Sequence, residues 1–463
     1  MPSTVPFFLH VRAAHKVILR EIIVDVKQTV RQEAQTWTER IRGSSFIQNV
    51  TVLVSGTALA QALQFLVSPV LSRLYDPSAF GLLGVFLATM GIVSVVAAAK
   101  YELSIVLPED EEDAANLFVL SCAIVCGVSL VVLVGVAFGR AIFAQLIGEP
   151  DLAPYFWWLP LGVLAVGLFQ VFNYWATRRK HYTRLSISQG IRSAGTAGVQ
   201  VPAGLLNGAA GGLIGGQVAG QVAATAVLGV QILKEDGHQI WKALRYTKIR
   251  NQASKHSKFP KFTAPQSMVN AVSQNIPAYM LAAFFSPSVV GFYWFTHRLL
   301  SAPSRLVGEA VRKVFYQQVS EKYARGESVY GNLWKTTAGL LGIGLVPTAL
   351  ILFAGPQLFS FAFGGEWQVA GVYAQWLTLW WLVGFINVPS TMLIHVFGLQ
   401  HLLLSYEVVL AIARVLAIAA GAYVGDAITS IMLFSIVGSV FNGAIIAFVF
   451  WQAKHRGKMN TLE

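Results

Sequence analysis

Twelve apolar stretches of roughly 20 to 25 residues follow one another along the chain, separated by polar connections. A helix needs about 20 apolar residues to cross about 30 Å of hydrocarbon. We therefore expect an all-α polytopic membrane protein with about 12 transmembrane helices. The predicted spans are 46–71, 80–106, 115–138, 154–176, 185–206, 211–233, 262–285, 289–312, 334–355, 371–395, 404–424 and 427–451.

Basic residues are confined to alternate connections and to the two tails, which hold 28 of the 34 lysines and arginines. Such residues stay on the cytoplasmic side during insertion, so both termini are predicted to be cytoplasmic. Charged residues make up only 12% of the chain and hydrophobic residues 55%, whereas soluble domains carry about 25% charged residues. The net charge of +12 follows from this bias, and nucleic-acid binding is not expected.

The basic linker 234–261 divides the predicted spans into two sets of six. We expect a cytoplasmic tail at 1–45 with the spacing of an amphipathic helix, six-helix bundles at 46–233 and 262–451, and a tail at 452–463. A shift of 210 residues superposes Gln64 on Gln274, Pro77 on Pro287 and Gly81 on Gly291. The pattern predicts parallel repeats related by a pseudo-two-fold axis along the membrane normal, which in transporters place the substrate between the halves.

Several cationic side chains fall inside predicted spans, where a charge costs at least about 2.5–3.5 kcal/mol. Arg298 and Arg414 lie deepest, whereas Arg192 and Lys100 lie nearer the inner surface. A hydrated cationic cavity for an anionic ligand explains them. Contact with carboxylates or carbonyls, or with the nearby interface, is the structural alternative.

Polar uncharged residues would line the same cavity, and the amides of Gln64, Asn270 and Gln274 suit a ligand with many hydroxyls. Hydrogen bonding between helices is the alternative explanation. The candidates for ion coupling are the titratable residues Glu102, His297 and His395. The pattern predicts no metal site. An interfacial belt explains most of the tryptophans at or just within the predicted outer ends, which are Trp157, Trp158, Trp376, Trp380 and Trp381.

Four sequence segments resemble the Wzx-like oligosaccharide flippases of the multidrug/oligosaccharidyl-lipid/polysaccharide (MOP) exporter superfamily. They are SPVLSRLYDPSAFG at 68–81, KYELSIVLP at 100–108, GFYWFTHRLLSAP at 291–303 and FGGEWQVAGVY at 363–373. The likeness extends over about residues 46–452. The basic N-terminal extension, Trp294 and His297 depart from the family pattern.

The resemblance implies two bundles arranged as a V around a cationic cavity. It also implies that undecaprenyl-diphosphate-linked oligosaccharide is flipped to the outer leaflet of the bacterial cytoplasmic membrane, for O-antigen, capsule or exopolysaccharide synthesis. The mechanism would be alternating access, driven by a gradient of H⁺ or Na⁺ without a cofactor. Implied partners are the lipid-linked oligosaccharide, membrane lipids, and a polymerase and chain-length regulator.

Two other functions fit the pattern less well. A cation-coupled small-molecule exporter of the same superfamily usually carries an acidic residue in the first bundle, and span 46–71 has none. A polysaccharide polymerase or ligase would need a large outer loop with catalytic residues, and the predicted outer connections are short. We therefore expect a transporter and not an enzyme.

Overall fold

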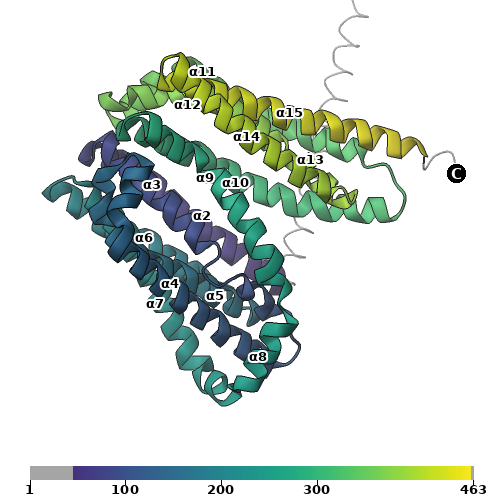
Figure 1. Ribbon diagram of the computed structural model, residues 1–463. Coiled ribbons are helices and arrows are strands. Elements are labelled where there is room, and N and C mark those ends of the chain that lie inside the picture. Colours follow the sequence, from purple (N-terminus) through teal and green to yellow (C-terminus); the bar gives the residue numbers. More distant parts are fainter. Residues whose placement is uncertain (1–44, 460–463) are drawn as a thin grey trace, which may run out of the picture.

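The computed structural model describes residues 45–459, which form 14 α-helices joined by turns and short 3₁₀ or π segments (Figure 1). The predicted N-terminal tail, up to residue 44, and the last four residues lie outside this range. The first helices are α2 (Ser45–Leu74), α3 (Pro77–Ser94), α4 (Glu111–Ile147), α5 (Leu159–Arg178), α6 (Tyr182–Leu206), α7 (Ala210–Ala243) and α8 (Tyr246–Lys255). The others are α9 (Ala264–Phe284), α10 (Pro287–Ala324), α11 (Tyr330–Phe363), α12 (Gln368–Ile386), α13 (Val388–Val396), α14 (Gln400–Val424) and α15 (Ala427–Met459).

Eight stretches of the described residues are long and apolar enough to cross a membrane. Large apolar side chains lie exposed on their surfaces, for example Phe138 at 85% and Phe353 at 86%, as expected for contact with lipid. Four long helices, α2, α6, α9 and α10, are not among the eight stretches. They carry Gln64, Arg192, Gln274 and Arg298 in turn. The chain is a multi-pass membrane protein whose candidate site residues lie mostly on its least apolar long helices.

The helices depart from the predicted spans in three places. The predicted span 80–106 is broken, because α3 ends at Ser94 and a 3₁₀ segment, η1 (Tyr101–Val106), follows a turn in which Ala99 and Lys100 adopt φ values of 50° and 63°. The predicted span 371–395 divides into α12 and α13, with a proline in the first turn of α13, where it cannot continue the preceding helix. The predicted linker is itself helical, since it contains the end of α7, α8 and most of a π-helical segment, η3 (Phe259–Thr263).

The helices pack as two groups, which we call the N-lobe (α2 to α7) and the C-lobe (α9 to α15), and the packing pattern repeats. In the N-lobe α6 packs on α2 and α7, and α5 packs on α4 and α7. In the C-lobe α14 packs on α9 and α15, and α12 packs on α11 and α15. The elements correspond in chain order, which agrees with the predicted duplication.

The lobes meet at the ends predicted to face outward, through the two copies of the repeated motif. A Cβ atom on Gly81 would lie 1.9 Å from the carbonyl oxygen of Pro287, and one on Gly291 would lie 1.8 Å from that of Pro77. The first turns of α3 and α10 therefore touch backbone to backbone, which only glycine permits. We call these four residues the outer seal.

Hydrogen bonds and aromatic contacts reinforce the outer seal. The Ser72 hydroxyl donates to the Phe363 carbonyl at 2.9 Å, and the Trp367 indole donates to the Ser72 carbonyl at 2.9 Å. The ring of Phe80 packs edge-on against Phe295 and Trp367. Figure 1 shows the lobes converging at this end and diverging toward α8 and the C-terminal end of α15.

Ion pairs tie the predicted inner end of the N-lobe together. Acidic residues begin α4, where they suit the helix dipole. Glu111 pairs with Arg178 at 3.2 Å, and Lys248 of α8 pairs with Glu112 at 2.5 Å. The Asn116 amide donates to the Ala243 carbonyl at the end of α7 at 2.9 Å, and its Oδ1 accepts from the Arg245 N–H, next to α8, at 3.1 Å. Helix α8 is therefore docked on the N-lobe.

Candidate functional site

Arg298 lies between the two lobes, near the middle of the path from the outer seal to the predicted inner end. It follows Pro287, the first residue of α10, by 11 positions, or about 17 Å of helix rise. Its Nη2 donates to the Gln64 Oε1 on α2 at 2.8 Å, and its guanidinium lies 5.3 Å from the Trp294 ring centroid. The charge is therefore held by a neutral amide and an aromatic face, and no carboxylate among the described residues pairs with it.

Arg414 lies inside the C-lobe, where only 6% of it is exposed. Its guanidinium is 5.3 Å from the Trp380 ring centroid and 5.4 Å from that of Phe434. The His297 ring stands 6.1 Å from the same Trp380 ring. Two of the predicted site residues, Arg414 and His297, thus share an aromatic cluster, with no ion pair to Arg414 in the described part of the chain.

The remaining cationic candidates lie in separate places in the N-lobe. On α6, Arg192 reaches α7, where its Nη1 is 3.5 Å from the Gln221 Oε1, and its buried Nε has no partner among the described residues. Lys100 stands 3.7 Å from Glu102, which is 1% exposed. This local contact corresponds to the structural alternative for Lys100, whose predicted role in the cavity stays a prediction.

The other predicted amides and His395 are exposed. Asn270 and Gln274 are exposed on α9, on successive turns of one helix face. His395 is exposed near the end of α13. The structure thus joins Arg298 to Gln64 and Arg414 to the His297 cluster, and it does not collect all the candidates into one contact network.

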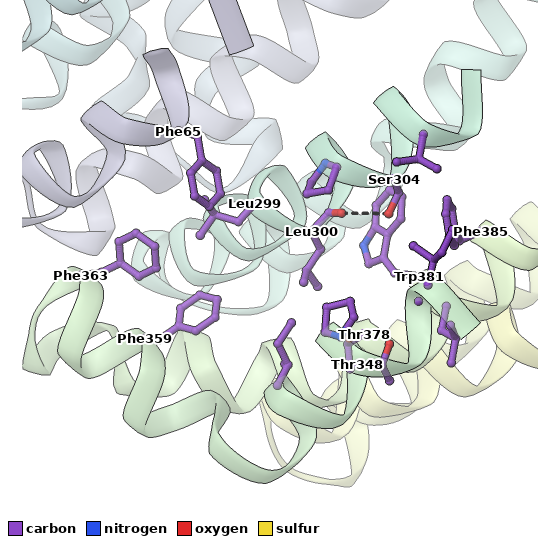
Figure 2. Close-up of a pocket in the computed structure, with 17 residues that line it drawn as sticks. Phe65, Leu299, Leu300, Ser304, Thr348, Phe359, Phe363, Thr378, Trp381 and Phe385 are labelled. Carbon is purple, nitrogen blue, oxygen red and sulfur yellow. Dashed lines mark hydrogen bonds between the residues drawn. The ribbon is translucent and has the colours of Figure 1, made fainter. Parts of the chain in front are cut away.

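An apolar cavity of about 310 Å³ lies beside Arg298, between α10, α11 and α12. Phe65, the neighbour of Gln64, lines it from the N-lobe, and Leu299 and Leu300 line it from α10 (Figure 2). A second cavity of about 170 Å³ contains Arg305 and Arg312. The sequence pattern did not predict either cavity.

Two of the tryptophans interpreted as part of the interfacial belt, Trp380 and Trp381, lie elsewhere. Trp380 packs on Trp381 with ring centroids 5.2 Å apart, and both rings contact His297. They therefore belong to the interior of the C-lobe and not to a belt facing lipid. The sequence did offer a signal for this burial. Both tryptophans lie well inside the predicted span 371–395, four to five residues before the buried Phe385.

Solved structures of membrane transporters share this fold. An inward-facing multidrug resistance MATE family transporter of the MOP superfamily superposes with a TM-score of 0.68 at 14% identity, covering 86% of this chain and 96% of that one. The lipid II flippase MurJ in an inward closed conformation gives 0.63 at 10% identity, covering 89% and 91%. An outward-facing MATE transporter gives 0.60 at 13% identity, covering 89% and 96%.

These likenesses establish a MOP-superfamily transporter fold. No curated protein sequence matches the chain. A family model described as "Polysaccharide biosynthesis protein" matches residues 70–372, more than half of the chain. The match confirms the resemblance found in the sequence segments, and the chain belongs to this polysaccharide biosynthesis protein family.

Proposed function

We propose that the protein flips undecaprenyl-diphosphate-linked oligosaccharide units from the inner to the outer leaflet of the bacterial cytoplasmic membrane. The family match to polysaccharide biosynthesis and the MOP transporter fold support this proposal. We further propose 12 transmembrane helices in two six-helix bundles, 46–233 and 262–451, joined by the linker 234–261, with both termini in the cytoplasm. A polymerase and a chain-length regulator would act on the flipped unit.

The contact between Arg298 and Gln64 carries the proposal. A guanidinium far from either end of its helix is costly to bury in a membrane protein, and here its partner is a neutral amide at 2.8 Å. A diphosphate offers a stronger, charge-assisted partner and displaces the amide without leaving a charge unpaired. The site is therefore suited to take up an anion and to release it again.

The packing of the lobes supports alternating access as the mechanism. The outer seal closes one end, while the lobes diverge toward the other (Figure 1). Rocking the lobes about Arg298 would open the outer end and close the inner one. The superposition with the inward-facing MATE transporter is closer than that with the outward-facing one, with TM-scores of 0.68 and 0.60.

The other candidates take supporting roles in this proposal. Lys100 and Arg192 would receive the anionic head group near the cytoplasm, and Arg414 would add positive potential from inside the C-lobe. The amides of Gln274 and Asn270 would bind sugar hydroxyls. The proposed ion-coupling residues, for a gradient of H⁺ or Na⁺, are Glu102, His297 and His395.

Substitutions at Arg298 and Gln64 test the proposal in a strain that lacks the chromosomal copy. Arg298→Ala should lower surface glycan at least tenfold and accumulate lipid-linked oligosaccharide on the inner leaflet. Gln64→Glu should have a similar effect, because a carboxylate would hold Arg298 in a permanent ion pair, whereas Gln64→Ala should retain most transport. Arg140→Ala is the matched control, since Arg140 stacks on Trp157, 4.6 Å from its ring centroid, at the outer end of α4.

Normal surface glycan from Arg298→Ala at normal protein level would refute the proposed role of Arg298. Cation-coupled drug export is the second candidate, because the chain superposes on a multidrug resistance transporter with a TM-score of 0.68. Expression in a drug-sensitive strain separates the two functions. Resistance without restored surface glycan would favour the exporter.

A further inference from the structure

The apolar cavity beside Arg298 is built to hold a hydrocarbon. Its lining contains five aromatic side chains, and its hydroxyl groups come only from Ser304, Thr348 and Thr378. The Ser304 hydroxyl is already used, since it donates to the Leu300 carbonyl at 3.2 Å. An apolar cavity of this size binds apolar molecules in preference to water.

The cavity lies in the C-lobe, and Phe65 lines it from the N-lobe side. Figure 2 shows Phe65 of α2 facing Phe359 and Phe363 of α11 at one end, with Trp381 and Phe385 at the other. Pro303 and Pro347 line it from α10 and α11. Proline removes a backbone hydrogen bond and disfavours a straight helix.

At the Trp381 end the apolar cavity adjoins the second, cationic cavity. The two share Ser304, Trp381 and Phe385. The second cavity adds Arg305, Glu309 and Arg312, and Glu309 pairs with Arg312 at 3.3 Å. We call the two adjoining cavities together the lipid groove, with an apolar end and a cationic end.

Unpartnered donors stand where the two parts of the groove join. The Trp381 indole nitrogen is buried and has no hydrogen-bond partner among the described residues. Arg305 is exposed and has neither an ion pair nor a hydrogen bond in the same part of the chain. A ligand with an acidic oxygen at this junction would satisfy both donors and neutralise the charge of Arg305.

We infer that the lipid groove binds the carrier lipid itself, with the isoprenoid chain in the apolar end and the diphosphate at Trp381 and Arg305. The inference rests on the proposed function and adds a site for the chain. The diphosphate bears more negative charge than a phospholipid phosphodiester, which suits the cluster of arginines. The flat double bonds of an isoprenoid also pack well on the aromatic lining.

The arginines of α10 give the head group a route from this groove. Arg312, Arg305 and Arg298 are spaced seven residues apart, so they lie close to one helix face at intervals of about 10 Å. A diphosphate taken up at Arg305 needs one such interval to reach Arg298. The chain remains in the groove while the sugars enter the space between the lobes.

Photolabelling with a sugar-free polyprenyl diphosphate that carries a diazirine on its chain tests the inference. The full-length protein is placed in nanodiscs of phosphatidylethanolamine and phosphatidylglycerol, and labelled peptides are mapped. Labels should fall on 299–307, 343–363 or 378–385. Ile351→Trp fills the apolar end and should reduce labelling at least fivefold, whereas Leu350→Trp should not, because Leu350 is 55% exposed and does not line the cavity.

Removing the charge of Arg305 tests the cationic end of the groove. Arg305→Ala should weaken the apparent affinity for the probe about tenfold, and Arg325→Ala, at the inner end of α10, should not. Unlabelled polyprenyl diphosphate should compete, and excess phosphatidylglycerol should not. Thermal unfolding of Ile351→Trp confirms that the variant is folded.

Each contrary result has a distinct meaning. Saturable labelling that maps elsewhere, or that Ile351→Trp leaves unchanged, would overturn the groove and leave the proposed function standing. Equal competition by phosphatidylglycerol would make the groove a site for bulk lipid and would also overturn the inference. No saturable labelling anywhere in the protein would count against both.

Discussion

Single residues in this protein show how a charge is kept available in a membrane. Arg298 is bound by an amide and an aromatic ring, and Arg414 by aromatic rings. A carboxylate partner would have satisfied either charge, but it would also have competed with an anionic ligand. Depth within a predicted span identified both arginines, whereas their different surroundings depend on tertiary contacts.

Glu149 is a titratable residue at the predicted outer end, and the sequence pattern gave no sign of its burial. It is 2% exposed, and its Oε1 has no partner among the described residues. The preceding residue, Gly148, is against the C-lobe, since a Cβ there would lie 3.0 Å from the Ala282 carbonyl oxygen. Burial, and then the nearby Asp151, raise the pKa of Glu149 from 4.5 to about 7.

This burial predicts that closure of the outer end depends on pH. A carboxyl group with a raised pKa in the closed state binds its proton more tightly there, so acid favours closure. The closed population should fall as pH rises from 4.5 to 7, and Glu149→Gln should abolish the change. Spin labels at Asn207→Cys and Tyr423→Cys, with Cys122 and Cys126 replaced by alanine, report the distance between the outer ends. A pH response that survives Glu149→Gln would assign it to another group.

Among the helices, the contact between α3 and α10 is the most constrained. Each first turn begins with proline and places a glycine four residues later against the other helix. Overpacking at such a contact costs about 1–3 kcal/mol. No adjustment of a flexible side chain can relieve it, because the opposing atoms are backbone.

Gly81→Ala or Gly291→Ala should therefore open the outer seal. We expect the ratio of closed to open outer ends to fall roughly 5- to 150-fold, the equivalent of that cost. Gly91→Ala on α3 is the control, since a Cβ there meets nothing within 4 Å. The same outer labels measure the effect, and identical distance distributions for Gly81→Ala and Gly91→Ala would contradict it.

The sequence predicts the positions of the helices better than the contacts between them. Apolar length located a helix for every predicted span, and aligned Pro77 and Pro287 revealed the repeat. The contact between the two copies could not be predicted, because a repeat does not say which faces pack. The break after Ser94 could not be predicted either. Alanine and lysine rarely adopt left-handed backbone, so nothing in the sequence indicates that Ala99 and Lys100 do so. The two cavities likewise depend on packing between α10, α11 and α12.

For the whole molecule, the structure predicts that the two ends open in opposition. Helix α8 is docked on the N-lobe by the pair of Lys248 with Glu112 and by Asn116, whose Oδ1 accepts from the backbone N–H of Arg245 just before α8. A label on α8 therefore reports the position of that lobe. Labels at Tyr246→Cys and Lys454→Cys should approach one another under conditions that separate the outer pair. An inner distance that stays constant while the outer one lengthens would indicate local loop opening in place of lobe rotation.

The reciprocal glycine contact bears on how such a chain could have arisen. Each copy of the proline–glycine turn presents the surface that the other copy needs, as in an isologous interface. A half-length ancestor could thus have closed against an identical molecule through these turns, before duplication and fusion joined them. After fusion neither turn is free to drift alone, because a bulky replacement in one must be accommodated by the backbone of the other.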